Sequence, residues 1–149
     1  MIDDINNKIL NILQMNSKTT NAEIARQVNM APSAVLERIR KLESRDIIKK
    51  YTVQINPVEV GKGLLAFIQV KANGPVVDMK VAKQISKISE VQEVHLIAGE
   101  DSYLVKVRIE NPEALTKLLR NKFAAIKSIR TTNTTIVLET IKETNELVF

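Results

Sequence analysis

Apolar residues recur at helical spacing in the first third of the chain. Asp3 can cap a helix there, and the residues behind it form one apolar stripe: Ile5, Ile9, Ile12 and Leu13. Such a stripe is buried along one side of a helix. The pattern therefore predicts a first helix over roughly residues 3–15.

Two further helices are indicated by their starting residues. Thr20, followed three residues later by Glu23, is a capping-box pattern that begins a second helix. Pro32 suits the first turn of a third helix, because backbone N–H groups in that turn have no partner within the helix and Pro lacks an N–H. The inward residues are Ile24, Ala25 and Val28 in the second helix, and Val35, Ile39 and Leu42 in the third. Three compact helices are thus expected.

The chain after the third helix has the pattern of an extended segment. Its apolar residues are Ile47, Ile48, Tyr51, Val53 and Ile55, and Asn56 and Pro57 end it. We predict a helix-turn-helix domain over residues 1–50, a hinge strand and linker over 51–63, and a second domain over 64–149.

The second domain shows the order strand, helix, strand, strand, helix, strand. The predicted strands are Leu64–Ala72, Val91–Ala98, Tyr103–Ile109 and Thr131–Ile141. The first helix has Val81, Ile85 and Ile88 inward and Lys80, Lys83 and Lys87 outward, and the second begins at Asn111 and Pro112. This order is the ferredoxin-like βαββαβ arrangement, so the fold class is α+β.

The first strand of that domain is apolar on both sides. Ala66, Ile68 and Val70 point one way, while Leu65 and Phe67 point the other. Helices cover only one face in this topology, so we expect the second face to pack against another subunit, most simply in a two-fold homodimer. Partial exposure of a few apolar side chains is the alternative.

Composition narrows the class of protein. The 149 residues hold 22 Lys and Arg, 17 Asp and Glu, and no Cys, for a net charge of +5. Without Cys there are no disulfides, no thiolate catalysis and few options for structural zinc. Neither a long apolar span nor a leader pattern is found, so a cytoplasmic protein is expected. Residues 1–50 hold nine basic and six acidic side chains, the denser excess, which permits a polyanionic partner.

Two series of residues form a pattern that spans nearly the whole chain. The first is Val35, Arg38, Ile39, Leu42, Glu43, Ile47, Ile48 and Tyr51. The second is Gly99 to Leu104, followed by Thr132, Thr134, Ile136, Val137 and Leu138. Together they resemble the Lrp/AsnC family, the feast/famine transcription regulators.

The resemblance implies a winged helix-turn-helix that reads operator DNA and a ferredoxin-like RAM/ACT-like domain that dimerises. It further implies assembly up to octamers and a small effector, commonly an amino acid, held between subunits. Carried over by position, the effector contacts are Gly99, Asp101, Ser102, Thr132 and Thr134. By spacing alone, the loop at Gly99 is equally a solvated hairpin turn.

Two positions depart from the family pattern. Asp46 stands where the family usually has Gly, and Asp tolerates a left-handed backbone, so the turn is expected to survive. Ser102 stands where the family often has Asp, and the neighbouring Asp101 is expected to replace it in recognising an ammonium group.

The outer side of the third helix is polar and cationic. Counted at ~100° per residue from Val35, the base-edge candidates on this side are Ser33, Leu36, Glu37 and Arg40. Arg40 can bridge guanine, Glu37 can accept from cytosine, and Leu36 can meet a thymine methyl group. The alternative is a solvated helix face with Arg40 paired to Glu37 or Glu43.

Phosphate contacts are expected beside it. The start of the second helix offers Thr19, Thr20 and Asn21, and nearby charge comes from Lys41, Arg45, Lys49 and Lys50. Arg38 is included among the DNA candidates, although its angle favours bracing of the second helix or of the wing over contact with DNA.

Enzyme chemistry finds little support. His95 is the single His, with no Cys to complete a metal site, so neither a catalytic residue nor a cofactor is expected. Sirohaem decarboxylases resemble this family in fold and remain an alternative, with Arg108, Arg130 and His95 as the residues for a carboxylate-rich substrate. A ligand-binding accessory module without DNA binding is the other alternative.

Overall fold

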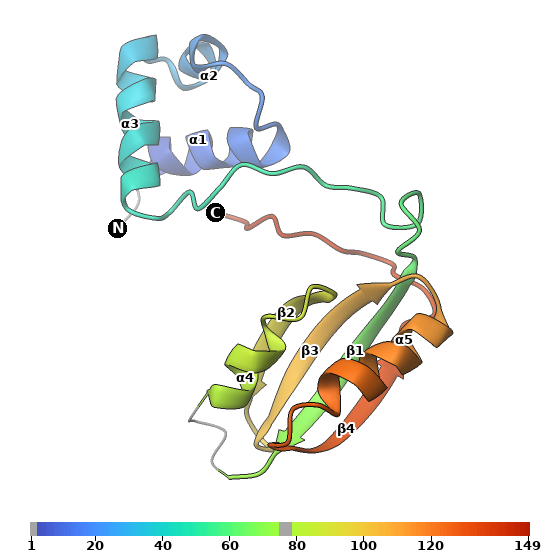
Figure 1. The fold of residues 1–149 in the computed structure, drawn as a ribbon. Helices are drawn as coiled ribbons and strands as arrows, with labels where there is room; N and C mark the ends of the chain where they lie inside the picture. Colours follow the sequence, from blue (N-terminus) through green and yellow to red (C-terminus); the bar gives the residue numbers. More distant parts are fainter. Residues whose placement is uncertain (1–2, 75–78) are drawn as a thin grey trace. The chain divides into compact units, whose positions relative to one another are not determined.

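The computed structural model describes residues 3–74 and 79–149, which form two compact units. One unit contains residues up to Gln54 together with Lys142–Phe149, and the other contains Ile55–Ile141. Figure 1 shows the elements of each unit along the chain. No helix among the described residues is long and apolar enough to cross a membrane.

The first unit contains three helices, α1 (Asp4–Met15), α2 (Asn21–Val28) and α3 (Pro32–Ser44). Both predicted caps are confirmed. The Asp3 carboxylate accepts a hydrogen bond from the Asn6 N–H at 2.7 Å, and the Thr20 hydroxyl accepts one from the Glu23 N–H at 3.2 Å. Each cap satisfies a backbone donor that the first turn of a helix leaves without a partner.

The three helices close a small apolar core. Its buried members are Ile9, Leu10, Ile24, Ala25, Val35, Ile39 and Leu42. The chain leaves α2 through Asn29 and turns after α3 at Asp46, both in left-handed backbone with φ of 55° and 56°. The expectation that Asp46 preserves this turn is confirmed. The core thus fixes which side of α3 is left outward.

The predicted hinge strand is not formed. Residues 45–63 contain no strand in the structure, and Val53 is 72% exposed. Alternating apolar residues suit a strand only when a neighbouring strand supplies hydrogen bonds, and this segment has none within the described chain. The prediction that residues 47–55 form a strand is therefore wrong.

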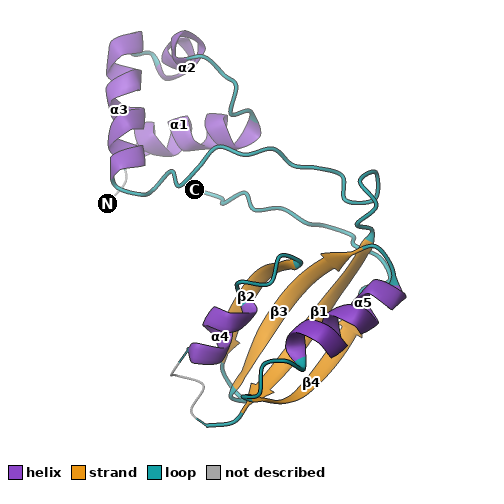
Figure 2. Ribbon diagram, viewed as in Figure 1, coloured by secondary structure: helices purple, strands orange, loops and turns teal. Residues whose placement is uncertain are grey.

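The second unit is one antiparallel sheet with helices on one face (Figure 2). Its strands are β1 (Leu64–Ala72), β2 (Val91–Ile97), β3 (Ser102–Ile109) and β4 (Ile129–Ile136), in the order β2-β3-β1-β4. The helices are α4 (Lys80–Ile85) and α5 (Pro112–Leu118), and α5 continues into a π-helical turn, η2 (Leu119–Phe123). The ferredoxin-like prediction is confirmed. The last strand ends at Ile136 rather than at Ile141 as expected, and Leu138 beyond it is 98% exposed.

The sheet has two distinct faces, as the alternation in β1 predicts. Ala66, Ile68 and Val70 are buried beneath the helices, together with Tyr103 and Val105 of β3. The opposite face, called the outer sheet face from here on, carries alternate residues of the same strands: Leu65, Phe67, Gln69 and Lys71 of β1, and Ser102, Leu104, Lys106 and Arg108 of β3. The register places Gln69 opposite Leu104.

Candidate functional sites

The outer side of α3 is exposed, whereas its inner side is buried. Val35, Ile39 and Leu42 anchor the helix in the core. The residues that the helical angle places opposite them, Ser33, Glu37, Arg40 and Ser44, are exposed, and Leu36 at the border is half-buried. The side chains predicted to reach base edges are therefore accessible.

Charges on this side are partly paired. Glu37 accepts from Lys41 at 2.7 Å, and the hydrogen bond and charge of Lys41 lower the pKa of Glu37. Arg40 forms no ion pair with any described residue, so the alternative pairing with Glu37 or Glu43 is not seen. Among these side chains, Arg40 thus keeps its five donors for another partner.

Glu43 is engaged elsewhere. It accepts a hydrogen bond from the Tyr51 hydroxyl at 2.9 Å. Partial burial of the phenol, followed by this hydrogen bond, raises the pKa of Tyr51 to about 12. Tyr51 therefore stays protonated and ties the start of the hinge to the end of α3.

Arg38 braces the first unit. Its guanidinium donates to the Asp3 carboxylate at 2.7 Å and to the Asn6 side-chain oxygen at 3.0 Å. The hydrogen bond from Arg38, with one from the Asn6 backbone, lowers the pKa of Asp3. Bracing was expected, but toward the second helix or the wing; the structure joins α3 to α1 instead. Both bonds use one terminal nitrogen, Nη1, so the other donors of Arg38 are not taken by them and its place among the DNA candidates stays a prediction.

The start of α2 is suited to an anion. Thr20 caps the helix, and the Thr19 hydroxyl donates to the Asn16 carbonyl at 2.8 Å. Asn21 is half-buried at the first helical position. The nearby basic residues Lys41, Arg45, Lys49 and Lys50 are all exposed. Helix N-termini offer backbone N–H groups and a positive dipole end to phosphate.

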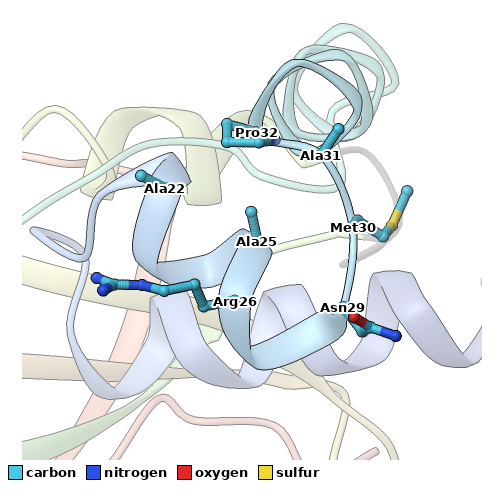
Figure 3. A pocket seen from close by; sticks show the side chains of 7 residues that line it. All are labelled: Ala22, Ala25, Arg26, Asn29, Met30, Ala31 and Pro32. Carbon is cyan, nitrogen blue, oxygen red and sulfur yellow. The ribbon is translucent and has the colours of Figure 1, made fainter.

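An open hollow lies between α2 and the turn into α3 (Figure 3). It is lined by Ala22, Ala25, Arg26, Asn29, Met30, Ala31 and Pro32. Small side chains dominate it, and Arg26 is its one charged lining residue. None of the predicted DNA or effector residues lines this hollow, so it belongs to the close packing of the helix-turn-helix.

In the second unit, the turn between β2 and β3 is held by side chains of β1. Gly99 and Asp101 both have positive φ, 100° and 46°, which makes the turn tight. The Gln69 amide donates to the Glu100 carboxylate at 2.9 Å and to the Ser102 hydroxyl at 3.0 Å. Lys71 pairs with Glu100 at 3.2 Å, and Lys71 and then Gln69 lower the pKa of Glu100.

The five predicted effector residues do not share one face. Ser102 is 0% exposed and lies on the outer sheet face with Gln69. Thr132 and Thr134 pair with Val70 and Ile68, so they point to the helix-covered side. The structure thus brings together Gly99, Asp101 and Ser102, and separates them from both threonines. Asn133, opposite Gln69, lies on the same face as the turn.

Sequence reasoning missed Gln69, Lys71 and Asn133. Their local pattern does not place them at the turn, because only the pairing of β1 with β3 and β4 carries them there. For Gln69 and Lys71, the available signal was their polarity on the second face of an otherwise apolar β1.

The three residues of the enzyme alternative are scattered. His95 and Arg108 lie on the outer sheet face, but His95 pairs with Leu104 and Arg108 with Leu65, about 13 Å apart along β3. Arg130 lies near the start of β4. His95 contacts Glu93 at 3.0 Å, which also accepts from Lys106 at 3.1 Å, so His95 is a satisfied strand residue. No metal-binding cluster occurs among the described residues.

Comparison with protein families gives two matches that cover most of the chain. Residues 2–43 match the AsnC-type helix-turn-helix domain, and residues 65–147 match the Lrp/AsnC ligand binding domain. The leucine-responsive regulatory protein of Escherichia coli is 34% identical over 149 residues, covering 99% of this chain and 91% of that protein.

Solved structures show the same architecture. AsnC from Escherichia coli has a TM-score of 0.91 at 27% identity, covering 98% of both chains. A transcriptional regulator from Neisseria meningitidis, in complex with L-Met, has a TM-score of 0.91 at 28% identity, covering 99% of this chain and 97% of that one. A feast or famine regulatory protein from Mycobacterium tuberculosis, complexed with L-methionine, has a TM-score of 0.89 at 31% identity over 99% of both chains.

Proposed function

Because the chain belongs to the Lrp/AsnC family of transcriptional regulators, we propose that α3 reads operator DNA while the second domain binds an amino acid. The observation that carries the DNA half is the outer side of α3, which is exposed and polar while its inner stripe is locked in the core. We treat residues 1–50 as the reading domain, 51–63 as the hinge and 64–149 as the sensing domain.

Base contacts come from four residues of α3: Ser33, Leu36, Glu37 and Arg40. Arg40 suits the O6 and N7 atoms of guanine, since its guanidinium presents paired donors and has no described ion-pair partner. Phosphate contacts come from Thr19, Thr20, Asn21, Lys41, Arg45, Lys49 and Lys50. These contacts set the register of the domain on the duplex, while the α3 residues specify the sequence.

Operator selection from a random duplex library tests this half. Arg40→Gln should weaken binding to the selected operator by about 5- to 150-fold, with a smaller effect on unrelated DNA. Lys8→Gln removes the same charge from an exposed position on α1 and should leave the operator affinity nearly unchanged. Selection of no sequence at all would favour an accessory ligand-binding module instead.

The effector site is proposed at the turn between β2 and β3. An amino acid carries an ammonium and a carboxylate group, and two side chains here match these charges: Asp101 of the turn for the ammonium, and Lys71 of β1, which pairs with Glu100, for the carboxylate. Gly99 permits close approach, and the buried Ser102 positions Gln69 rather than facing the ligand. Thr132 and Thr134 complete the proposed set only as residues of a neighbouring subunit, because within one chain they lie on the helix-covered side of the sheet.

Calorimetry with the twenty amino acids tests the effector site, beginning with L-methionine, which relatives of known structure bind. Asp101→Asn should weaken the binding at least about tenfold, since it removes the ammonium partner. Glu139→Gln, an exposed acid beyond β4, is the matched control. Absence of heat with all twenty would overturn this half alone.

A homodimer is proposed through the outer sheet face, with octamers as the larger assembly. Phe67 places apolar area on this face, where no helix of the same chain covers it, whereas Leu65 beside it is already buried, at 6% exposed. Phe67→Glu should give a monomer by light scattering, and a retained dimer mass would overturn the arrangement. A dimer presents two reading helices to half-sites about 34 Å apart or a multiple of that distance, so a half-turn insertion should weaken binding.

Binding rather than catalysis is the proposed activity, because His95, Arg108 and Arg130 are not gathered into one pocket. We place the protein in the cytoplasm, where the DNA that it is proposed to read is found.

A further inference from the structure

Charge is divided between the two sides of the second domain. Residues 80–90 and 112–128 hold the helices and the segments that follow them, called the helix layer here, and contain seven Lys or Arg and two Glu. Residues 64–74, 91–111 and 129–141 hold the strands and contain four Lys or Arg and five Asp or Glu. The positive charge of this domain is therefore concentrated over the helices.

Both acids of the helix layer are already neutralised. Glu113 pairs with Lys117 at 2.8 Å, and Glu90 pairs with Lys122 at 2.7 Å. The hydrogen bond from Lys122 lowers the pKa of Glu90, so this carboxylate is charged and occupied at neutral pH. Neither acid is left to offset the other cations.

The remaining cations are accessible. Lys83, Lys87, Arg120 and Lys127 are exposed, and none forms an ion pair within the part of the chain that the structure describes. The contact of Lys122 in η2 with Glu90 joins the segment after α5 to the segment after α4. Figure 1 shows α4 and α5 on the same face of the sheet, so their charges belong to one surface.

We propose that the helix layer is a second DNA-contact surface, which binds the phosphate backbone of duplex DNA outside the operator half-sites. The proposal rests on the proposed function, which already brings DNA to this molecule. A duplex carries one negative charge per ≈ 1.7 Å of its axis, and contacts to it release counterions without reading sequence. Exposed Lys and Arg on flexible stems suit that kind of contact.

Among its described residues, the helix layer exposes basic side chains but no large apolar side chains that could insert into a membrane. The large apolar residues of the layer, Leu115, Leu118 and Phe123, are buried against the sheet. Binding in a membrane interface draws on exposed apolar side chains as well as basic ones. Duplex DNA requires only the basic ones, and is therefore the partner that the surface fits better.

The test compares two triple variants of the full-length protein with the same net charge. Lys83→Gln/Lys87→Gln/Lys127→Gln removes three charges from the helix layer. Lys8→Gln/Lys62→Gln/Lys142→Gln removes three from other exposed or half-exposed positions. Binding is measured against salt on an operator duplex of about 25 base pairs, enough for two half-sites. It is measured again on one of about 150 base pairs, a persistence length of DNA.

On the long duplex, the helix-layer variant should lower the slope of log affinity against log salt by about 2–3, since each lost phosphate contact contributes roughly 0.9. The control variant should keep the wild-type slope, and on the short duplex all three proteins should agree. Equal slopes for both variants on the long duplex would overturn the proposal.

Two other outcomes can be distinguished from these results. If the helix-layer variant loses binding to phosphatidylserine vesicles while its DNA slope is unchanged, the surface belongs to anionic lipid and the proposal is wrong. If the wild type fails to bind the short operator, the proposed reading function itself is overturned.

Discussion

In the first domain, the residues proposed to contact DNA bases lie on one helix, whereas in the second, those proposed to contact a ligand come from strands and a turn. Val35 and Ile39 fix the direction of Arg40 through the geometry of a single helix. The turn at Asp101 is held by Gln69, which reaches it only because β1 pairs with β3. One site is built locally and the other by contacts between distant segments.

This difference sets how each site should respond to change. Side chains on the outer side of α3 stand largely alone, so substitutions there should act independently. Around the turn, Gln69, Lys71, Glu100 and Ser102 share hydrogen bonds and charge, so one substitution should disturb the others. The predictions below use matched changes in the two domains, from the largest expected effect to the smallest.

The largest effect should come from the two cores. Ile24→Ala and Ile68→Ala each truncate a 0% exposed isoleucine, one in each domain. Such truncations cost about 2–5 kcal/mol of unfolding free energy. The described part of the reading domain has seven buried core residues, so Ile24→Ala should abolish operator binding while leaving amino-acid binding measurable. For Ile68→Ala, calorimetric melting should instead show a lower stability of the sensing domain. If each variant lost both operator binding and amino-acid binding, the two domains would not have independent cores.

The second prediction concerns the support of the turn. Gln69→Met keeps the shape of the side chain but removes both donors to Glu100 and Ser102. Loss of these bonds should weaken amino-acid binding by about tenfold, the equivalent of about 1.4 kcal/mol. Titration calorimetry with L-methionine measures this. Gln84→Met, on exposed α4, is the control, and equal affinity of the two variants would show that Gln69 does not position the turn.

What could be predicted from the sequence follows the same division. The caps at Asp3 and Thr20 and the inner stripe of α3 depend on residues within a few positions, and these predictions are confirmed. The two faces of β1 could also be predicted, because alternation is a local property. The DNA and effector residues stay predictions, although their places in the fold are now known.

Contacts between distant segments could not be predicted. Thr132 and Thr134 face away from the turn at Ser102 because β4 pairs with β1 in the register that sets them opposite Val70 and Ile68. The partner of Arg38 lies 35 residues away, at the start of α1, further along the sequence than the second helix that was expected to receive it. The periodicity of residues within one segment predicts neither the pairing register of β4 nor the partner of Arg38.

The third prediction compares two identical ion pairs, one in each domain. Glu37→Gln releases Lys41 on α3, and Glu113→Gln releases Lys117 on α5; both pairs span four residues and are exposed. On a short duplex of unrelated sequence, the Glu37 carboxylate no longer competes with phosphate for Lys41, which should raise affinity by about 2- to 5-fold and steepen the salt slope by up to roughly 0.9. Fluorescence anisotropy at several salt concentrations measures both. Glu113→Gln should have no effect there, and an equal gain from both variants would remove α3 from the DNA interface.

The smallest effect should come from the ion pair between Asp3 and Arg38. Arg38 lowers the pKa of Asp3 in the folded state, so the pair stabilises the reading domain above the ordinary carboxyl pKa near 3.8, and this contribution is lost as the pH falls through the lower folded value. Asp3→Asn keeps a capping side chain but removes the charge. It should lower the melting temperature by about 1–4 °C at pH 7, with the difference from wild type shrinking below about pH 4.

Asp4→Asn is the control. It removes a charge from the neighbouring residue, Asp4, which forms no ion pair with any described residue, and it should show less of this pH dependence. A difference that persists unchanged at pH 3 would mean that Asp3 acts through its cap alone, and that the link from α1 to α3 contributes nothing to holding the reading helix.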